Sequence, residues 1–81
     1  REIKFCYEQQ LQKDKTLAGQ VVMNFTISAT GNVVAAKTKK TSLNNAAVES
    51  CMASKIRRWV FPEPKGGGIV IVNYPFNFSS N

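Results

Sequence analysis

Side chains that could perform acid–base or nucleophilic chemistry are few and widely separated in this sequence. Histidine is absent, and the five carboxylates show no pairing at a spacing that acid–base catalysis would use: Glu2, Glu8, Asp14, Glu49 and Glu63. A serine or cysteine nucleophile would lack the histidine base that commonly activates it. We therefore expect no enzymatic activity and no cofactor.

The two cysteines, Cys6 and Cys51, are the residues most able to form a covalent link. An even number in a short chain suggests one disulfide in an oxidising compartment, and two buried free thiols are the alternative. If paired, they would stabilise the domain by about 4 kcal/mol according to chain-entropy reasoning. Two isolated cysteines without histidine cannot supply the four ligands of a zinc site, so no metal is expected.

The charge balance permits an anionic partner but does not require one. Eleven Lys and Arg residues against five Asp and Glu residues give a net charge of +6, which either attracts nucleic acid, membranes or acidic proteins or simply keeps a small domain soluble. Lys37, Lys39 and Lys40 lie close together, but no interleaved aromatic residues accompany them to stack on bases. A basic domain that binds nucleic acid or another anionic polymer is the second functional hypothesis.

Residues 69–78 are the stretch on which the first hypothesis depends. They are rich in β-branched and aromatic types and follow a run of glycines, which predicts a strand. Alternation places five apolar residues on one face, which we expect to cover the core over its whole length: Val70, Val72, Tyr74, Phe76 and Phe78. Pro75 lacks an N–H group and marks an edge strand, in which the backbone N–H and C=O groups of odd-numbered residues point to the unpaired edge. Such an open edge is either a liability or a docking site.

Periodicity and capping patterns predict four further elements. They are a helix over residues 1–13, a strand over 20–29, a returning strand over 33–41 and a second helix from Asn44 or Asn45 to about residue 58. Gly31 suits the tight turn between the two strands, and Lys13 suits the carboxyl end of the first helix. The lysines of residues 33–41 protect the opposite edge. Trp59 and Phe61 are expected to close one end of the core.

The order α-β-β-α-β predicts a two-layer α+β domain spanning residues 1–81. We expect a three-stranded antiparallel sheet in the order 2-1-3, with both helices on one face. The last strand would then be antiparallel to the first, and Cys6 in the first helix could reach Cys51 in the second.

The ordered motifs of the chain resemble the C-terminal domain of TonB-type proteins. The resemblance rests on residues 19–27, Gly31-Asn32-Val33, Ser42-Leu43, residues 59–62 and the final alternating strand. More narrowly, four stretches resemble the AgmX/PglI C-terminal subfamily of myxobacterial envelope proteins, some of which belong to gliding-motility machinery: residues 6–8, 48–51, 58–64 and 67–78.

This resemblance implies a periplasmic domain of a longer protein that is anchored in the inner membrane by an upstream segment. The chain lacks an initial Met, so we expect it to be a fragment. The function implied is energy transduction or gliding motility through a partner, an extended segment of an outer-membrane or periplasmic protein, with no nucleic acid. The segment would add as a strand to the last strand, although self-pairing is also possible. The expected partner-binding residues are Gly68, Ile69, Val70, Ile71, Val72, Asn73 and Tyr74.

Overall fold

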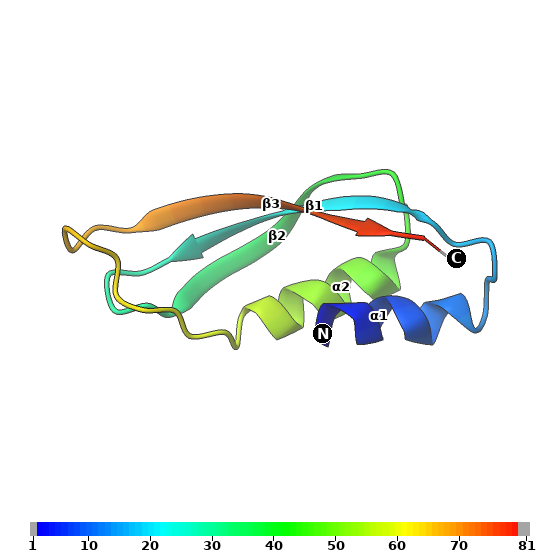
Figure 1. Cartoon of the computed structure of the whole chain (residues 1–81), viewed down its shortest axis with the longest axis horizontal. Helices are drawn as coiled ribbons and strands as arrows, with labels where there is room; N and C mark the ends of the chain where they lie inside the picture. The colour runs from blue at the N-terminus through cyan, green and yellow to red at the C-terminus, as the bar shows by residue number, and fades with distance from the viewer. Residues whose placement is uncertain (1, 80–81) are drawn as a thin grey trace.

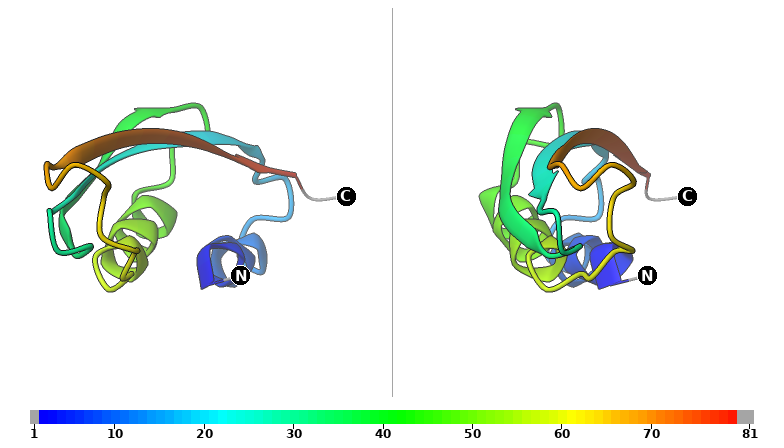
Figure 2. Two further views of the ribbon diagram at one scale, coloured as in Figure 1. Left: turned by 60° about the vertical axis from the view of Figure 1, so that its left-hand side comes forward. Right: turned by 90° about the vertical axis from the view of Figure 1, so that its left-hand side faces the viewer.

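The computed structural model describes residues 2–79 and contains five elements in the predicted order. They are α1 (Glu2–Leu11), β1 (Gly19–Ile27), β2 (Val33–Thr41), α2 (Ala46–Ile56) and β3 (Val70–Phe78). The strands form one antiparallel sheet in the order β2-β1-β3. Figure 1 and Figure 2 show both helices on one face of this sheet. The predicted α+β fold is therefore confirmed.

The core lies between the central strand and the two helices. β1 alternates strictly, and its inward side chains are all buried: Val21, Met23, Phe25 and Ile27. The helices cover them with one apolar stripe each, formed by Ile3, Cys6 and Tyr7 of α1 and by Val48, Met52 and Ile56 of α2. This is the period-2 and period-3.6 patterning that the sequence displays.

The start of α2 agrees with the sequence, whereas the end of α1 does not. Asn45 is the N-cap of α2, and its side chain accepts a hydrogen bond of 3.0 Å from the Val48 backbone N–H. α1 ends at Leu11, so the prediction that it includes Lys13 is wrong. The Asp14 carboxylate accepts hydrogen bonds from the Thr16 hydroxyl and backbone N–H, which favours a turn over further helix. The same two bonds, the hydroxyl first, lower the pKa of Asp14.

The turn between β1 and β2 also holds the connector, residues 57–69, which joins α2 to β3. Gly31 has a φ of 91°, and its carbonyl oxygen accepts a hydrogen bond of 2.8 Å from the Phe61 N–H. Asn32 forms an isolated antiparallel bridge with Val60. β1 ends at Ile27 rather than at the predicted Ala29, because the chain turns at Ser28, whose N–H bonds to the Asn32 carbonyl oxygen.

The helices are too short to cover the sheet. α1 and α2 contain ten and eleven residues, whereas β1 and β3 contain nine each. Helical residues rise 1.5 Å and strand residues about 3.3 Å, so the helices are roughly half as long as the strands. The domain measures 44 × 19 × 19 Å, and the half of the sheet near the β1–β2 turn extends beyond the helices (Figure 1).

This mismatch corrects one sequence-based expectation about β3. Its even-numbered face does not cover the core over its whole length, because Val70 is 39% exposed and Tyr74 is 53% exposed. Only Val72, Phe76 and Phe78 pack against the core. β3 also begins at Val70, one residue later than predicted.

The disulfide between Cys6 and Cys51 joins α1 to α2, with 5.6 Å between the two Cα atoms. Tyr7 further secures α1, because its hydroxyl donates to the Leu17 carbonyl oxygen and its ring stacks on Phe78.

Neither helix in residues 2–79 has the length and hydropathy that a membrane span requires.

Candidate functional site: an open sheet edge above an apolar groove

The backbone groups of β3 divide between its neighbour β1 and the open edge of the sheet. On β1, the Gln20 carbonyl accepts from the Ser42 N–H and the Ser28 N–H donates to the Asn32 carbonyl. The backbone N–H and C=O groups of even-numbered residues in β1 therefore point toward β2. The backbone groups of odd-numbered residues in β1 point toward β3, and the pairing register between these two strands has no shift. Their partners are even-numbered residues, such as Tyr74 opposite Met23. The backbone groups of the odd-numbered residues of β3, Pro75 included, consequently point toward the open edge of the sheet, as the sequence predicts.

The two edges of the sheet differ in how they resist further pairing. The register between β1 and β2 shifts twice, which leaves Val34 and Lys39 of β2 as bulged residues. Lysines and bulges are common devices against the addition of another strand. β3 has an unbroken register over nine residues, and only Pro75 interrupts its outward row of donors. Of the two edges within residues 2–79, β3 is therefore the one open to pairing.

Amide side chains join β1 and β3 on the solvent face. The Asn24 Nδ2 group donates to Asn73 Oδ1, and the Gln20 Nε2 group donates to Asn77 Oδ1, each at 2.9 Å. Both are directly opposed pairs in the register. Such cross-strand pairs hold the outer strand in place, which makes β3 a firm template despite its edge position.

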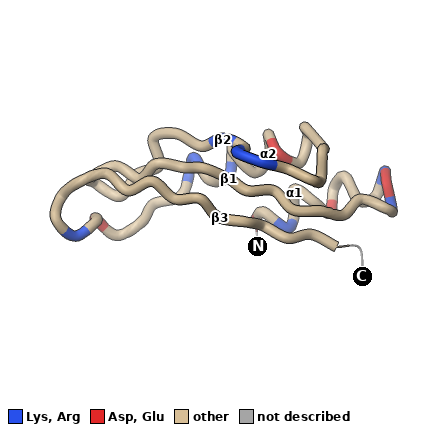
Figure 3. The backbone as a smooth tube through the Cα atoms, turned by 90° about the horizontal axis from the view of Figure 1, so that it is seen from above, with Lys and Arg blue, Asp and Glu red and all other residues tan. Residues whose placement is uncertain are grey.

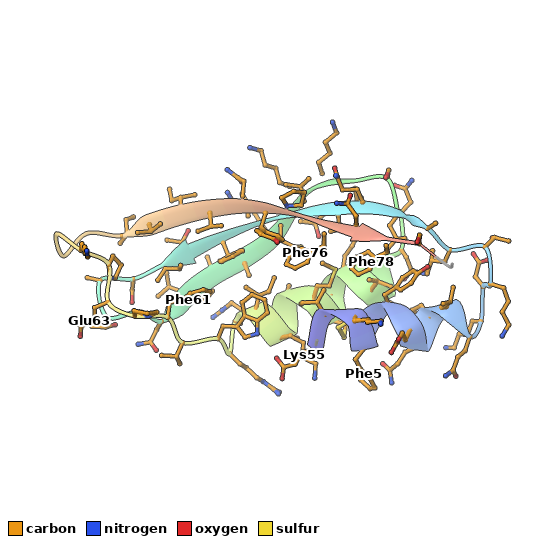
Figure 4. All side chains as sticks on the ribbon, viewed as in Figure 1. Phe5, Lys55, Phe61, Glu63, Phe76 and Phe78 are labelled. Atoms are coloured by element: carbon orange, nitrogen blue, oxygen red, sulfur yellow. A yellow bond between two sulfur atoms is a disulfide. The ribbon has the colours of Figure 1, made fainter. Side chains whose placement is uncertain are left out.

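An apolar groove of about 360 Å³ lies beneath β3, on the helix side of the sheet, over the part that the helices do not reach. Six residues line it: Phe25, Trp59, Phe61, Val72, Tyr74 and Phe76. The ring centroid of Phe25 lies 6.2 Å from that of Trp59 and 6.1 Å from that of Phe61. The aromatic rings of the connector therefore pack against the central strand. Figure 4 shows Phe61 and Phe76 on the helix side of the sheet.

α1 borders a second hollow that continues the groove along β3. Trp59 and Phe76 line both hollows, and Ile3, Lys4, Tyr7 and Phe78 contribute to the second. The Trp59 indole N–H donates to the Glu2 carboxylate at 3.2 Å. This bond orients the indole ring at the junction of the two hollows, so α1 helps to position the aromatic wall.

The structure places the predicted partner-binding residues at the start of β3. Val70, Ile71, Val72, Asn73 and Tyr74 belong to the strand, whereas Gly68 and Ile69 precede it. The side chains divide as their alternation requires: Val72 and Tyr74 line the groove, and Asn73 lies on the solvent face with Asn24. Figure 3 shows the basic residues distributed over several elements. Lys37 and Lys40 lie in β2, on the opposite edge of the sheet, where they pair with β1.

Sequence reasoning identified the edge but missed the groove. Trp59 and Phe61 were expected at one end of the core, where they do pack, but partial exposure leaves them available as a wall. The bridge between Asn32 and Val60 and the bond between Trp59 and Glu2 join residues that are distant in the sequence, and no local pattern reveals them. The short predicted helices were the available signal, because they could not span the strands.

The site defines a small α+β domain with an exposed edge strand, a class suited to binding extended polypeptide. One solved structure shares this fold: the C-terminal domain of TonB from Helicobacter pylori (residues 179–285), determined by NMR in solution. The TM-score is 0.60 at 23% sequence identity, with 96% of this chain and 77% of that chain covered. No protein-family model matches the chain, and no curated protein does. The TonB-type fold is thus shown.

Proposed function

We propose that this domain is a protein–protein interaction module that binds an extended segment of a partner by adding it as a strand to β3. The observation that carries the proposal is the contrast between the two sheet edges. β2 is bulged and rich in lysine, whereas β3 offers the outward N–H and C=O groups of Ile71 and Asn73 in regular spacing. Main-chain hydrogen bonds along such an edge supply affinity with little dependence on the partner's sequence.

The setting we propose is the periplasm, as part of an envelope-spanning protein with a TonB-like role in energy transduction or gliding motility. Two observations support it. The fold is that of a TonB C-terminal domain, and the disulfide between Cys6 and Cys51 suits an oxidising compartment. The partner would be a segment of an outer-membrane or periplasmic protein, reached by a domain that is itself tethered to the inner membrane upstream.

The substitution Ile71→Pro tests strand addition directly. It removes an N–H group that points away from β1, and Val70 is already extended, as a residue before proline must be. We expect the fold to persist and partner binding to fall at least tenfold. The measurement is an amide chemical-shift titration with synthetic peptides that tile the periplasm-facing ends of the source organism's outer-membrane proteins.

The matched control is Ile71→Val, which keeps the N–H group and the β-branched shape and should bind as the native domain does. Peptide-induced shifts should be concentrated at residues 70–74. Shifts confined to Lys37, Lys39 and Lys40 of β2, or equal binding by the proline and valine variants, would contradict the proposal.

A further inference from the structure

We infer that the segment bound at β3 carries large apolar side chains at alternate positions, seated in the groove under the edge, with an amide or hydroxyl side chain opposite Asn73. This inference rests on the proposed function and specifies the chemistry of the partner. It follows from the register of β3, the lining of the groove and the charge of the chain.

The register decides which partner side chains meet the groove. Residues directly opposite each other in a sheet project to the same face. Partner residues opposite Val72 and Tyr74 would therefore project to the helix side, where those two residues line the groove. Partner residues opposite Ile71 and Asn73 would project to the solvent face. This alternation holds whether the added strand is parallel or antiparallel.

The lining of the groove decides which side chains can enter. All six residues that form it are aliphatic or aromatic, and none carries a formal charge. A charged side chain placed there would lose hydration without gaining a partner, whereas an apolar one would gain from burial. The volume of about 360 Å³ accommodates branched aliphatic or aromatic side chains at successive inward positions.

The solvent face of β3 adds a polar requirement at one position. Asn73 accepts a hydrogen bond from Asn24 through its Oδ1 atom, so its Nδ2 group can donate to an added strand. Asn24 is itself opposite Lys37 of β2, which makes a polar row across the sheet. An Asn, Gln, Ser or Thr opposite Asn73 would continue this row.

The charge of the domain selects against basic partner segments. The net charge is +6, and Lys4 borders the hollow that continues the groove beneath the end of β3. The side chain of Lys4 is 74% exposed and lies 3.9 Å from its nearest carboxylate, Glu8, so it remains available to a partner. Acidic residues flanking the apolar positions would speed association and discriminate against basic segments.

Two peptides of identical composition test the inference. The first, Asp-Val-Thr-Phe-Asn-Val-Asp, alternates its apolar residues, and the second, Asp-Thr-Val-Phe-Val-Asn-Asp, places them consecutively. We expect at least tenfold tighter binding of the first, with shifts of the Ile71 and Asn73 amides. The single tryptophan, Trp59, lines the groove, so its fluorescence emission should move to the blue only with the first peptide.

A matched pair of variants locates the effect. Tyr74→Ser should weaken binding of the alternating peptide at least fivefold, whereas Val34→Ser should leave it unchanged. Both residues are 53% exposed, but Tyr74 lines the groove and Val34 lies on the opposite edge strand. Circular dichroism and thermal unfolding would show that both variants remain folded.

The outcomes separate this inference from the proposed function. Equal binding of the two peptides, with the Ile71 and Asn73 amides perturbed by both, would overturn the inference and leave strand addition standing. If neither peptide perturbs those amides at millimolar concentration, both fail. The domain could instead sediment as a dimer whose β3 amides are protected from hydrogen exchange before any peptide is added. That result would show a second copy of the chain in the groove and would also overturn the inference.

Discussion

At the scale of single residues, a few positions fix how distant segments meet. Gly31 is the clearest case, because it has a positive φ of 91° and its carbonyl holds the Phe61 N–H. A Cβ atom added at Gly31 would lie 2.0 Å from the Phe61 carbonyl oxygen. Glycine is therefore required here for close approach as well as for conformation. The position of Phe61, and with it one wall of the groove, depends on this contact.

The substitution Gly31→Ala should destabilise the domain by about 2–4 kcal/mol, since the strained φ and the clash with Phe61 add together. Gly66→Ala is the matched control, because Gly66 has a φ of 89° but no atom within 4 Å of the added Cβ. It should cost only about 1 kcal/mol. Urea unfolding of the two variants measures the difference, and equal losses would show that the contact with Phe61 is not tight.

At the scale of elements, the boundaries of α2 and β3 follow from local chemistry. Asn45 starts α2 by accepting from Val48, and its own N–H donates to the Glu49 carboxylate at 3.3 Å. β3 begins after the glycines and is identified as an edge strand by Pro75. Both features are written in short stretches of sequence, which explains why they could be predicted.

Replacement of the helix cap provides a test at this scale. Asn45→Ala leaves the Val48 N–H without its acceptor and should lower the free energy of unfolding by about 1 kcal/mol. Asn44→Gly is the control, because Asn44 has a positive φ of 54° that glycine adopts without strain. That variant should be as stable as the native domain or slightly more stable. The prediction fails if chemical denaturation shows the larger loss for Asn44→Gly.

At the scale of the whole molecule, α1 is fastened to the rest of the domain at three places. The disulfide joins it to α2, Tyr7 joins it to Leu17 and Phe78, and Glu2 joins it to Trp59. An 81-residue domain has a small core, so a covalent link contributes a large part of its stability. The same helix borders the hollow that continues the groove along β3, and its Glu2 orients Trp59 in the groove wall. Stability and the shape of the site are therefore coupled through α1.

Reduction of the disulfide should lower the free energy of unfolding by about 4 kcal/mol, because the unfolded chain regains the freedom of a long loop. Urea denaturation with and without dithiothreitol measures this change. The double variant Cys6→Ser/Cys51→Ser is the control, and its midpoint should not respond to the reductant. An unchanged midpoint for the native domain under reducing conditions would contradict the expected contribution.

The sequence by itself determined the elements, their order and the edge position of β3. Alternation in β1, the stripes of α1 and α2, the cap at Asn45 and the missing N–H of Pro75 are local patterns with local physical causes. Besides the ends of α1 and β1 and the start of β3, the expected inward burial of Val70 and Tyr74 failed, because a strand's apolar face is covered only where another element reaches it.

Only the tertiary structure decided where that cover ends. Helices of ten and eleven residues stop beneath the middle of the sheet, and the connector is held under the far half by Gly31 and Asn32. The groove between them is formed by residues from β1, β3 and the connector, which meet only after folding. Its existence depends on the lengths of the helices relative to those of the strands and on long-range hydrogen bonds, and no single segment specifies either of them alone.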